Sequence, residues 1–139
     1  MKDDGGDENM HFYAVNIDGT NEIDLTPFEN VQARIIDDLE DDPDYVLIGL
    51  NKRNPQIHDP YRVNVNTGEM EMIAENPGNI SGWVTDHNGK LRMATTSDGV
   101  NTSLLYRKSE SDEFKTILTT DFKVAVSPLF FTFDNKNIY

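Results

Sequence analysis

The stretch "NVNTGEMEMIAEN" at residues 64–76 contains the end of one strand, a Gly turn and a second strand with alternating apolar and polar side chains. A similar segment, "NIDGTNEIDLTPF", occupies residues 16–28, and a looser copy, "KSESDEFKTILTT", occupies residues 108–120. Three such hairpins in 139 residues indicate an internal repeat. The length of that repeat decides the fold.

Two series of spacings define the repeat. In each hairpin a Tyr is followed 12 positions later by Leu or Ile; the pairs are Tyr13 and Leu25, Tyr61 and Ile73, and Tyr106 and Leu118. A large apolar residue with an Asp three positions later recurs every 48 residues; these pairs are Ile35 and Asp38, Trp83 and Asp86, and Phe131 and Asp134. The repeat is therefore about 45 to 48 residues long, and the chain contains just under three of them.

The sequence predicts short strands throughout, because alternating and β-branched segments stand between turn signals and no stretch keeps a helical period. Four strands in a repeat of about 48 residues are typical of a β-propeller blade, and they disfavour a sandwich or a barrel. We therefore predict an all-β fold, a partial β-propeller of about three four-stranded antiparallel blades, two whole and two half. The expected parts are a half blade at 1–30, a blade at 31–78, a blade at 79–121 and a half blade at 122–139.

Composition limits the partners. The chain has 25 acidic and 12 basic residues, a net charge of −13, and this field repels phosphate backbones and anionic lipid. We expect neither nucleic acid nor membrane as a partner. The longest apolar run, "YVLIGL" (45–50), is far too short to span a bilayer, and there is no Cys to form a disulfide or a thiolate metal site. We expect a soluble protein, and the compartment, cytoplasmic or periplasmic, is left open.

Two long segments carry a family resemblance: "GGDENMHFYAVNIDGTNEIDLTPFENVQARI" (5–35) and "DYVLIGLNKRNPQIHDPYRVNVNTGEMEMIAENPGNISGWVTDHNGKLRMAT" (44–95). They resemble the propeller domain of prolyl oligopeptidase-family serine peptidases, in the branch of acylaminoacyl and dipeptidyl peptidases. The most specific parts are the loop at 6–9 with Tyr13 and Asp18-Gly19-Thr20, and the block at 51–68. The resemblance implies a propeller that covers an α/β-hydrolase domain and admits only short peptides to its Ser-Asp-His triad.

The catalytic domain that the resemblance implies is absent from these 139 residues. The nucleophile elbow G-x-S-x-G does not occur, and the closest string, "GNISG" (78–82), has Ile80 where Ser is required. We predict no catalytic, cofactor-binding or metal-binding residue and no cofactor for this chain. The predicted function is a segment of the substrate-gating propeller of a serine peptidase, with peptide bound through the missing catalytic domain.

Several other features are interpreted as structural. The acidic loops "DDLEDDPD" (37–44) and "DDGGDEN" (3–9) could attract Ca²⁺, but the former lacks the Gly and the spaced Glu of an EF-hand, and both are predicted to be solvated loops. The three His residues are too widely spaced for metal ligands and are expected in loops and on strand surfaces; they are His11, His58 and His87. Trp83 is predicted to be a core residue between blades.

Two other classes of function compete with the peptidase segment. One is a fragment of a non-enzymatic propeller of the TolB or WD kind that acts as a scaffold for protein interactions. The other is a glycan-processing propeller enzyme with catalytic residues on blade loops. The specific hairpin resemblance favours the peptidase. Because an arc of three blades leaves apolar faces and strand edges open, we also expect a longer parent polypeptide and self-association of the isolated chain.

Overall fold

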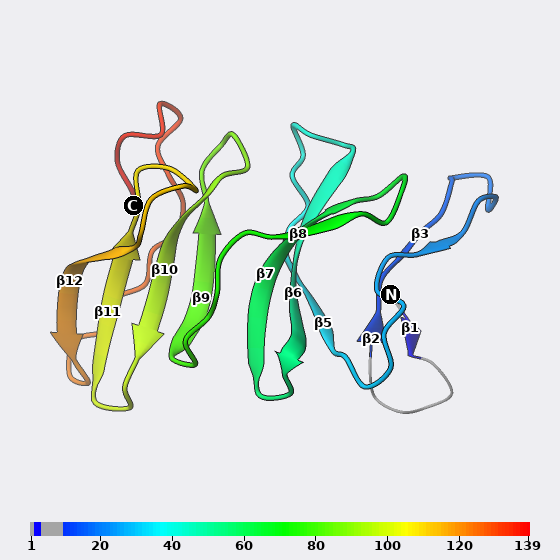
Figure 1. Cartoon of the computed structure of the whole chain (residues 1–139). Coiled ribbons are helices and arrows are strands. Elements are labelled where there is room, and N and C mark those ends of the chain that lie inside the picture. The colour runs from blue at the N-terminus through cyan, green and yellow to red at the C-terminus, as the bar shows by residue number, and fades with distance from the viewer. Residues whose placement is uncertain (1, 4–9) are drawn as a thin grey trace. The chain divides into compact units, whose positions relative to one another are not determined.

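The computed structural model describes residues 2–3 and 10–139, and the described residues form twelve β-strands and no helix. No helix long and apolar enough to cross a membrane occurs in this part of the chain. The chain divides into two compact units, Met1–Asn76 (unit 1) and Pro77–Tyr139 (unit 2). The strands of unit 1 are β1 (Lys2–Asp3), β2 (Met10–His11), β3 (Tyr13–Ala14), β4 (Ile23–Asp24), β5 (Ala33–Asp37), β6 (Tyr45–Asn54), β7 (Ile57–Asn64) and β8 (Met70–Met72) (Figure 1). Those of unit 2 are β9 (Ile80–Thr85), β10 (Leu91–Ser97), β11 (Asn101–Tyr106) and β12 (Lys115–Asp121).

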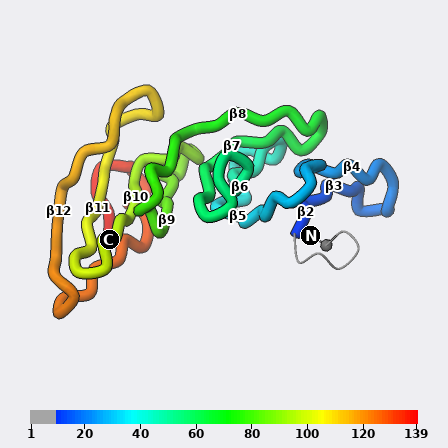
Figure 2. The backbone as a smooth tube through the Cα atoms, turned by 60° about the horizontal axis from the view of Figure 1, so that its bottom comes forward, coloured from blue at the N-terminus to red at the C-terminus, as the bar shows by residue number. Residues whose placement is uncertain are grey.

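Each unit contains one four-stranded antiparallel sheet in which neighbours in sequence are neighbours in space. The orders are β5-β6-β7-β8 in unit 1 and β9-β10-β11-β12 in unit 2. Within each unit the tube trace follows these strands side by side (Figure 2). This meander of four strands is the architecture of a propeller blade, so the all-β, partial-propeller fold class is confirmed. The two whole blades correspond to these two sheets.

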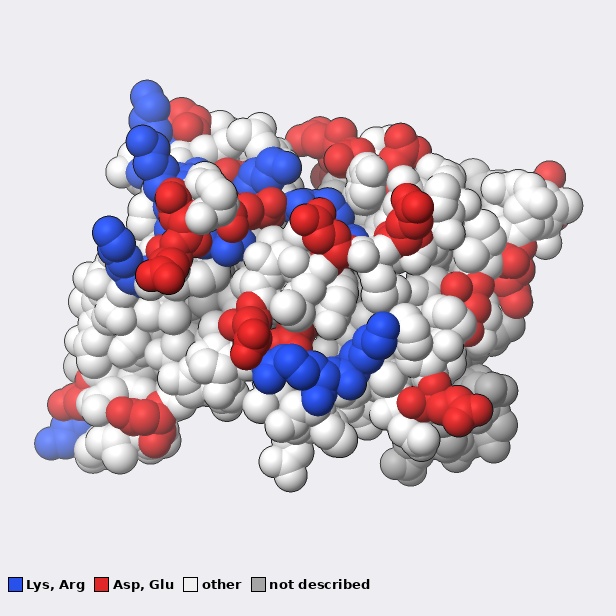
Figure 3. All heavy atoms as spheres, viewed as in Figure 1, with Lys and Arg blue, Asp and Glu red and all other residues white. Residues whose placement is uncertain are grey.

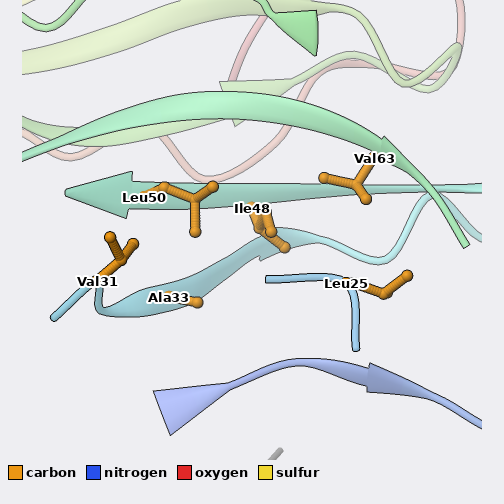
Figure 4. Packing of buried hydrophobic residues seen from close by; sticks show 6 residues of the cluster. All are labelled: Leu25, Val31, Ala33, Ile48, Leu50 and Val63. Carbon is orange, nitrogen blue, oxygen red and sulfur yellow. The ribbon is translucent and has the colours of Figure 1, made fainter. Parts of the chain in front are cut away.

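The core of unit 1 lies between its sheet and the hairpin that precedes it. β6 is apolar at consecutive positions and is buried from Leu47 to Asn51, because the sheet is covered on both faces there. Six side chains form the cluster: Leu25, Val31, Ala33, Ile48, Leu50 and Val63 (Figure 4). Phe12 and Ile23, from the segment that contains β3 and β4, pack against this cluster. We call β3 and β4 with their connecting turn the N-terminal hairpin.

The core of unit 2 joins its sheet to the last residues of the chain. Met93, Leu104 and Phe131 are buried together. Phe131 forms an isolated antiparallel bridge with Ile138, and residues 129–139 make up what we call the C-terminal hairpin. The backbone N–H of Tyr139 donates to Phe130 O at 3.1 Å. The C-terminal hairpin is therefore part of unit 2 and packs on its sheet.

In two of its three copies the spacing of 12 residues corresponds to the same backbone hydrogen bond between the two strands of the hairpin. The backbone N–H of Leu25 donates to Phe12 O at 2.8 Å, and that of Ile73 donates to Pro60 O at 2.9 Å, which is the same bond one repeat later. The third copy differs, because a bulge interrupts the pairing of β11 and β12 and places Leu118 opposite Leu104. An inserted residue changes the register without changing the residue types that define the spacing.

The 48-residue series marks equivalent strand positions but not equivalent burial. Ile35 lies opposite Ile48 and Trp83 lies opposite Ala94, each on the first strand of its sheet. Phe131 is 3% exposed, whereas Ile35 is 58% exposed, so the two equivalent positions differ in burial. Trp83 is half-buried and packs on Phe114, with ring centroids 5.9 Å apart.

The Asp residues of the same series also show a shift. Asp86 accepts the N–H of Asn88 at 2.9 Å, and Asp134 accepts the N–H of Lys136 at 3.2 Å, two residues on in both turns. In unit 1 the equivalent bond, from Leu39 N–H at 3.0 Å, goes to Asp37 and not to Asp38. The reason is the register shift in β5 between Ile35 and Asp37. The prediction was therefore one residue off in this turn.

The net charge is carried by one unit. Unit 1 has 18 Asp and Glu residues against five Lys and Arg, and unit 2 has seven against seven. Figure 3 shows acidic side chains over the N-terminal hairpin on the face that it displays. All of the charge of −13 therefore belongs to unit 1, and unit 2 is neutral.

Candidate functional site

In unit 1 the buried carboxylate of Asp59 on β7 is hydrogen-bonded to β6 and to the segment after β8. Asp59 is 0% exposed and receives two hydrogen bonds of 3.0 Å from Arg53, one from Nε and one from a terminal nitrogen. The same guanidinium donates to Asn76 O at 2.7 Å, and Asn76 N–H donates to Asp59 at 2.8 Å. The hydrogen bond to Asp59 raises the pKa of Arg53, so the guanidinium stays charged. The cluster fastens the segment after β8 to β7.

A second arginine has the same type of role in unit 2. Arg92 donates to Asp86 Oδ2 at 3.1 Å, to Asn135 O at 3.0 Å and to the Tyr106 hydroxyl at 2.6 Å. Its guanidinium carbon lies 5.0 Å from the centre of the Phe131 ring. Burial alone would lower the pKa of Arg92, but its hydrogen bonds to Asp86 and Tyr106 raise it overall. Arg92 therefore connects β10 with the turn of the C-terminal hairpin as a permanent cation.

The C-terminal hairpin borders an apolar pocket of about 620 Å³. Its walls are residues 130–134, with His87, Asn137 and Tyr139. The ring of His87 stacks on Phe133 at 5.0 Å, and its Nε2 lies 2.8 Å from Phe131 O. Phe133 is 93% exposed, so the pocket is open to solvent. Its polar groups are too few and too exposed to activate a nucleophile.

The structure keeps the three His residues apart. His11 is buried and pairs with Asp24 at 3.1 Å, and His87 belongs to the pocket. His58 is half-buried, and its Nε2 has no hydrogen-bond partner among the described residues. Burial, and after it the charge of Arg34, lowers the pKa of His58. Among the described residues no group of three His, Asp or Glu side chains is placed to hold a metal ion.

Two carboxylates of the acidic loop at 37–44 accept hydrogen bonds from nearby parts of the chain. Asp37 accepts from the backbone of Leu39, and Asp44 accepts from the Asn66 side chain at 2.8 Å. Leu39 is 5% exposed, so an apolar side chain anchors the loop. These contacts make a compact turn and no cage of oxygens. Of the other acidic loop, at 3–9, residues 4–9 lie outside the described structure.

The described structure contains no Ser-His-Asp arrangement. The one buried His with a carboxylate partner, His11, is paired within the N-terminal part of unit 1, which contains no Ser residue. In unit 2, Ser81 donates to Thr95 O and Ser103 pairs with Thr119. A hydrolytic triad requires the Ser hydroxyl to be within hydrogen-bond reach of the His ring.

Sequence reasoning missed both arginine clusters. Arg53 and Asp59 are six residues apart, and so are Asp86 and Arg92, which is too far for a local contact in an extended strand. The pairs meet because a hairpin folds each strand back on its neighbour. An Arg and an Asp on either side of a predicted turn are the available signal. The third partners are backbone carbonyls, which carry no sequence signal.

Comparison with known proteins confirms the resemblance to dipeptidyl peptidases. The whole chain is 32% identical over 147 aligned residues to dipeptidyl aminopeptidase BIII of Pseudoxanthomonas mexicana, of which it spans 20%. Over 81% of its length it is 29% identical to dipeptidyl peptidase family member 6 of Caenorhabditis elegans, of which it spans 16%. No family model and no solved structure matches the chain. The chain thus corresponds to about a fifth of proteins that are named as peptidases.

Proposed function

We propose, from this homology to dipeptidyl peptidases, that the chain is a non-catalytic propeller segment of a serine peptidase that hydrolyses short peptides. The observation that carries the proposal is the match of the whole chain to only 20% of a named dipeptidyl aminopeptidase. The remaining four fifths of such a protein leave ample room for a catalytic domain. The peptidase-related origin follows from the homologues. The gating role is the part that we propose.

The sheets have the properties that a gate requires. A wall that excludes folded proteins must resist deformation, and in each sheet an Arg paired with a buried Asp holds a loop to the strands. In unit 1 Arg53 fixes the exit from β8, and in unit 2 Arg92 fixes the C-terminal hairpin. Each guanidinium bridges a carboxylate and a backbone carbonyl, so movement of either loop would break more than one charge-assisted bond.

The experiment uses the longer protein that contains this sequence, produced alongside the 139-residue chain. We expect a fluorophosphonate probe, which reacts with activated Ser, to label the longer protein and not the 139-residue chain. The longer protein should release p-nitroaniline from dipeptidyl substrates and leave folded proteins intact. Labelling of the 139-residue chain would contradict a non-catalytic segment. A longer protein without labelling or hydrolysis would point to the propeller scaffold.

Gating itself is tested by loosening one sheet in the longer protein. Arg53→Met removes the guanidinium that joins Asp59 to Asn76 O and leaves only the direct bonds of Asn76 to β7. We expect faster cleavage of a long peptide relative to a dipeptidyl substrate. Lys52→Met is the matched control, because Lys52 is exposed and its Nζ lies 4.0 Å from the centre of the Phe28 ring, away from the Asp59 cluster. An unchanged ratio of the two cleavage rates in Arg53→Met would refute gating while leaving the peptidase assignment in place.

A further inference from the structure

β12 is an exposed edge strand of the sheet in unit 2. In the strand order of that sheet it neighbours β11 alone, and no other described strand pairs with it (Figure 1). The side chains of Ile117 and Leu118 on this strand are 55% and 44% exposed. One side of the β12 backbone therefore has hydrogen-bonding groups that no other described strand uses.

The centre of β12 has the composition of a segment that pairs readily with other strands. Residues 116–120 are Thr-Ile-Leu-Thr-Thr, which contain no charge, Gly or Pro, and four of the five are β-branched. Exposed segments with high β-propensity and no charge tend to associate edge to edge. The only charges of the strand are Lys115 at its first position and Asp121 at its last.

A bulge interrupts β12 at Ile117. Leu104 and Leu105 are adjacent on β11, but they lie opposite Leu118 and Thr116 on β12, so Ile117 is an extra residue. Successive residues of a regular strand present their N–H and C=O groups to alternate sides. An extra residue breaks this alternation, because the residues before and after it no longer follow the same pattern.

The bulge shortens the edge that a further strand could use. Residues 118–121 pair with β11 in one regular run, and residues 115–116 pair with it in another. A straight strand that matches the hydrogen-bonding groups of the first run does not match those of the second. The bulge therefore leaves a regular run of four residues, whereas all six paired residues would be continuous without Ile117.

The other edge strands of the two four-stranded sheets also have features that limit pairing. β5 and β9 each contain one extra residue, Ile36 and Ser81. β8 has no bulge, but it is only three residues long and has the charged Glu71 at its centre. β12 is seven residues long and has no charge between its ends, so the bulge is the feature that interrupts its edge.

We propose that the bulge at Ile117 prevents β12 of one copy of this chain from pairing with β12 of a second copy. The two ends of the strand have opposite charges, so an antiparallel pair of β12 strands brings Lys115 of each copy toward Asp121 of the other. This charge complementarity makes a second copy the partner that the bulge excludes. Removal of the extra residue should produce a sheet that continues from one copy into the next.

The experiment compares the unaltered chain with a variant from which Ile117 is deleted. In the unaltered chain we expect the β12 amides that β11 does not bind to exchange hydrogen rapidly at every protein concentration. In the deletion variant their exchange should become about tenfold slower as the concentration rises into the micromolar range. Sedimentation should show a larger species than for the unaltered chain. Urea unfolding followed by the fluorescence of Trp83 checks that the variant is folded.

Two further variants distinguish strand pairing from other causes of association. Ile117→Thr removes the apolar side chain and keeps the extra residue, so it should behave like the unaltered chain. Thr119→Lys, added to the deletion, places a charge in the middle of the edge and should abolish the concentration-dependent protection.

Four results would overturn the proposal: concentration-dependent protection of β12 in the unaltered chain, no added protection in the deletion variant, association of Ile117→Thr like that of the deletion, and association that Thr119→Lys does not reduce. Loss of the Trp83 unfolding transition in the deletion variant would overturn it as well, because the sheet itself would then require the bulge. None of these readouts involves peptide hydrolysis, so the proposal can fail while the peptidase proposal stands.

Discussion

Replacing Arg92 by Met tests whether a buried ion pair holds unit 2 together. The Arg92 and Asp86 side chains are only 12% and 4% exposed, so removal of the cation leaves a carboxylate away from water. Loss of one partner of a buried pair costs about 3 to 5 kcal/mol. Asp86 Oδ1 keeps the N–H groups of Asn88 and Lys90, at 2.9 and 3.0 Å, whereas Oδ2 loses the Arg92 contact. We therefore expect the lower end, about 3 kcal/mol.

The assay is urea unfolding followed by the fluorescence of Trp83, the single Trp, which lies in unit 2. With a urea dependence of about 2 kcal/mol/M, the midpoint should fall by about 1.5 M. Lys90→Met is the control, because it removes an exposed cation from the same turn and should change stability by less than about 0.5 kcal/mol. Arg92→Met combined with Asp86→Asn should recover part of the loss, since no unpaired charge remains. A loss below about 1 kcal/mol, or a double variant whose losses simply add, would refute the buried-pair reasoning.

Two further predictions concern unit 1. Burial, and after it the charge of Arg34, lowers the pKa of His58 below 6.5, so the unfolded chain binds a proton at His58 more readily than the folded chain does. The contribution of His58 to stability should therefore be fully present above pH 6.5 and should be lost as the pH falls below it. His58→Gln should reduce the change of the melting temperature between about pH 7 and about pH 5. An unchanged pH dependence in this variant would show that another group is responsible. Gly68 has φ of +75°, so Gly68→Ala should cost about 1 kcal/mol in thermal unfolding; Gly82→Ala in unit 2, where added carbon meets nothing within 4 Å, is the control, and equal costs would contradict the argument.

The two four-stranded sheets could be predicted from the sequence because the spacing of turns and apolar residues indicates the order of the strands. The short strands that the sequence predicts throughout are observed as β1 to β12. The details that failed are those that a count of residues cannot detect. A bulge adds a residue to one strand only, and this is why Asp37 takes the turn position predicted for Asp38.

The burial of individual residues and the side-chain contacts between distant parts of the sequence could not be predicted, for a different reason. The equivalence of Ile35 and Phe131 holds for the backbone, but exposure depends on which element covers each face. The contacts of Arg92 reach a carbonyl 43 residues away, and those of Arg53 reach one 23 residues away. Such partners are chosen by the tertiary fold. The pattern of residue types can predict a strand without predicting what its longest side chains will reach.

The unequal division of charge makes this molecule respond to its buffer in two different ways. In dilute buffer the acidic unit carries its own Coulomb repulsion, and the neutral unit carries almost none. Sodium chloride screens the repulsion within unit 1 and has almost no effect on the stability of unit 2. Heating at low ionic strength should therefore melt Met1–Asn76 before Pro77–Tyr139, and added salt should draw the two calorimetric transitions together.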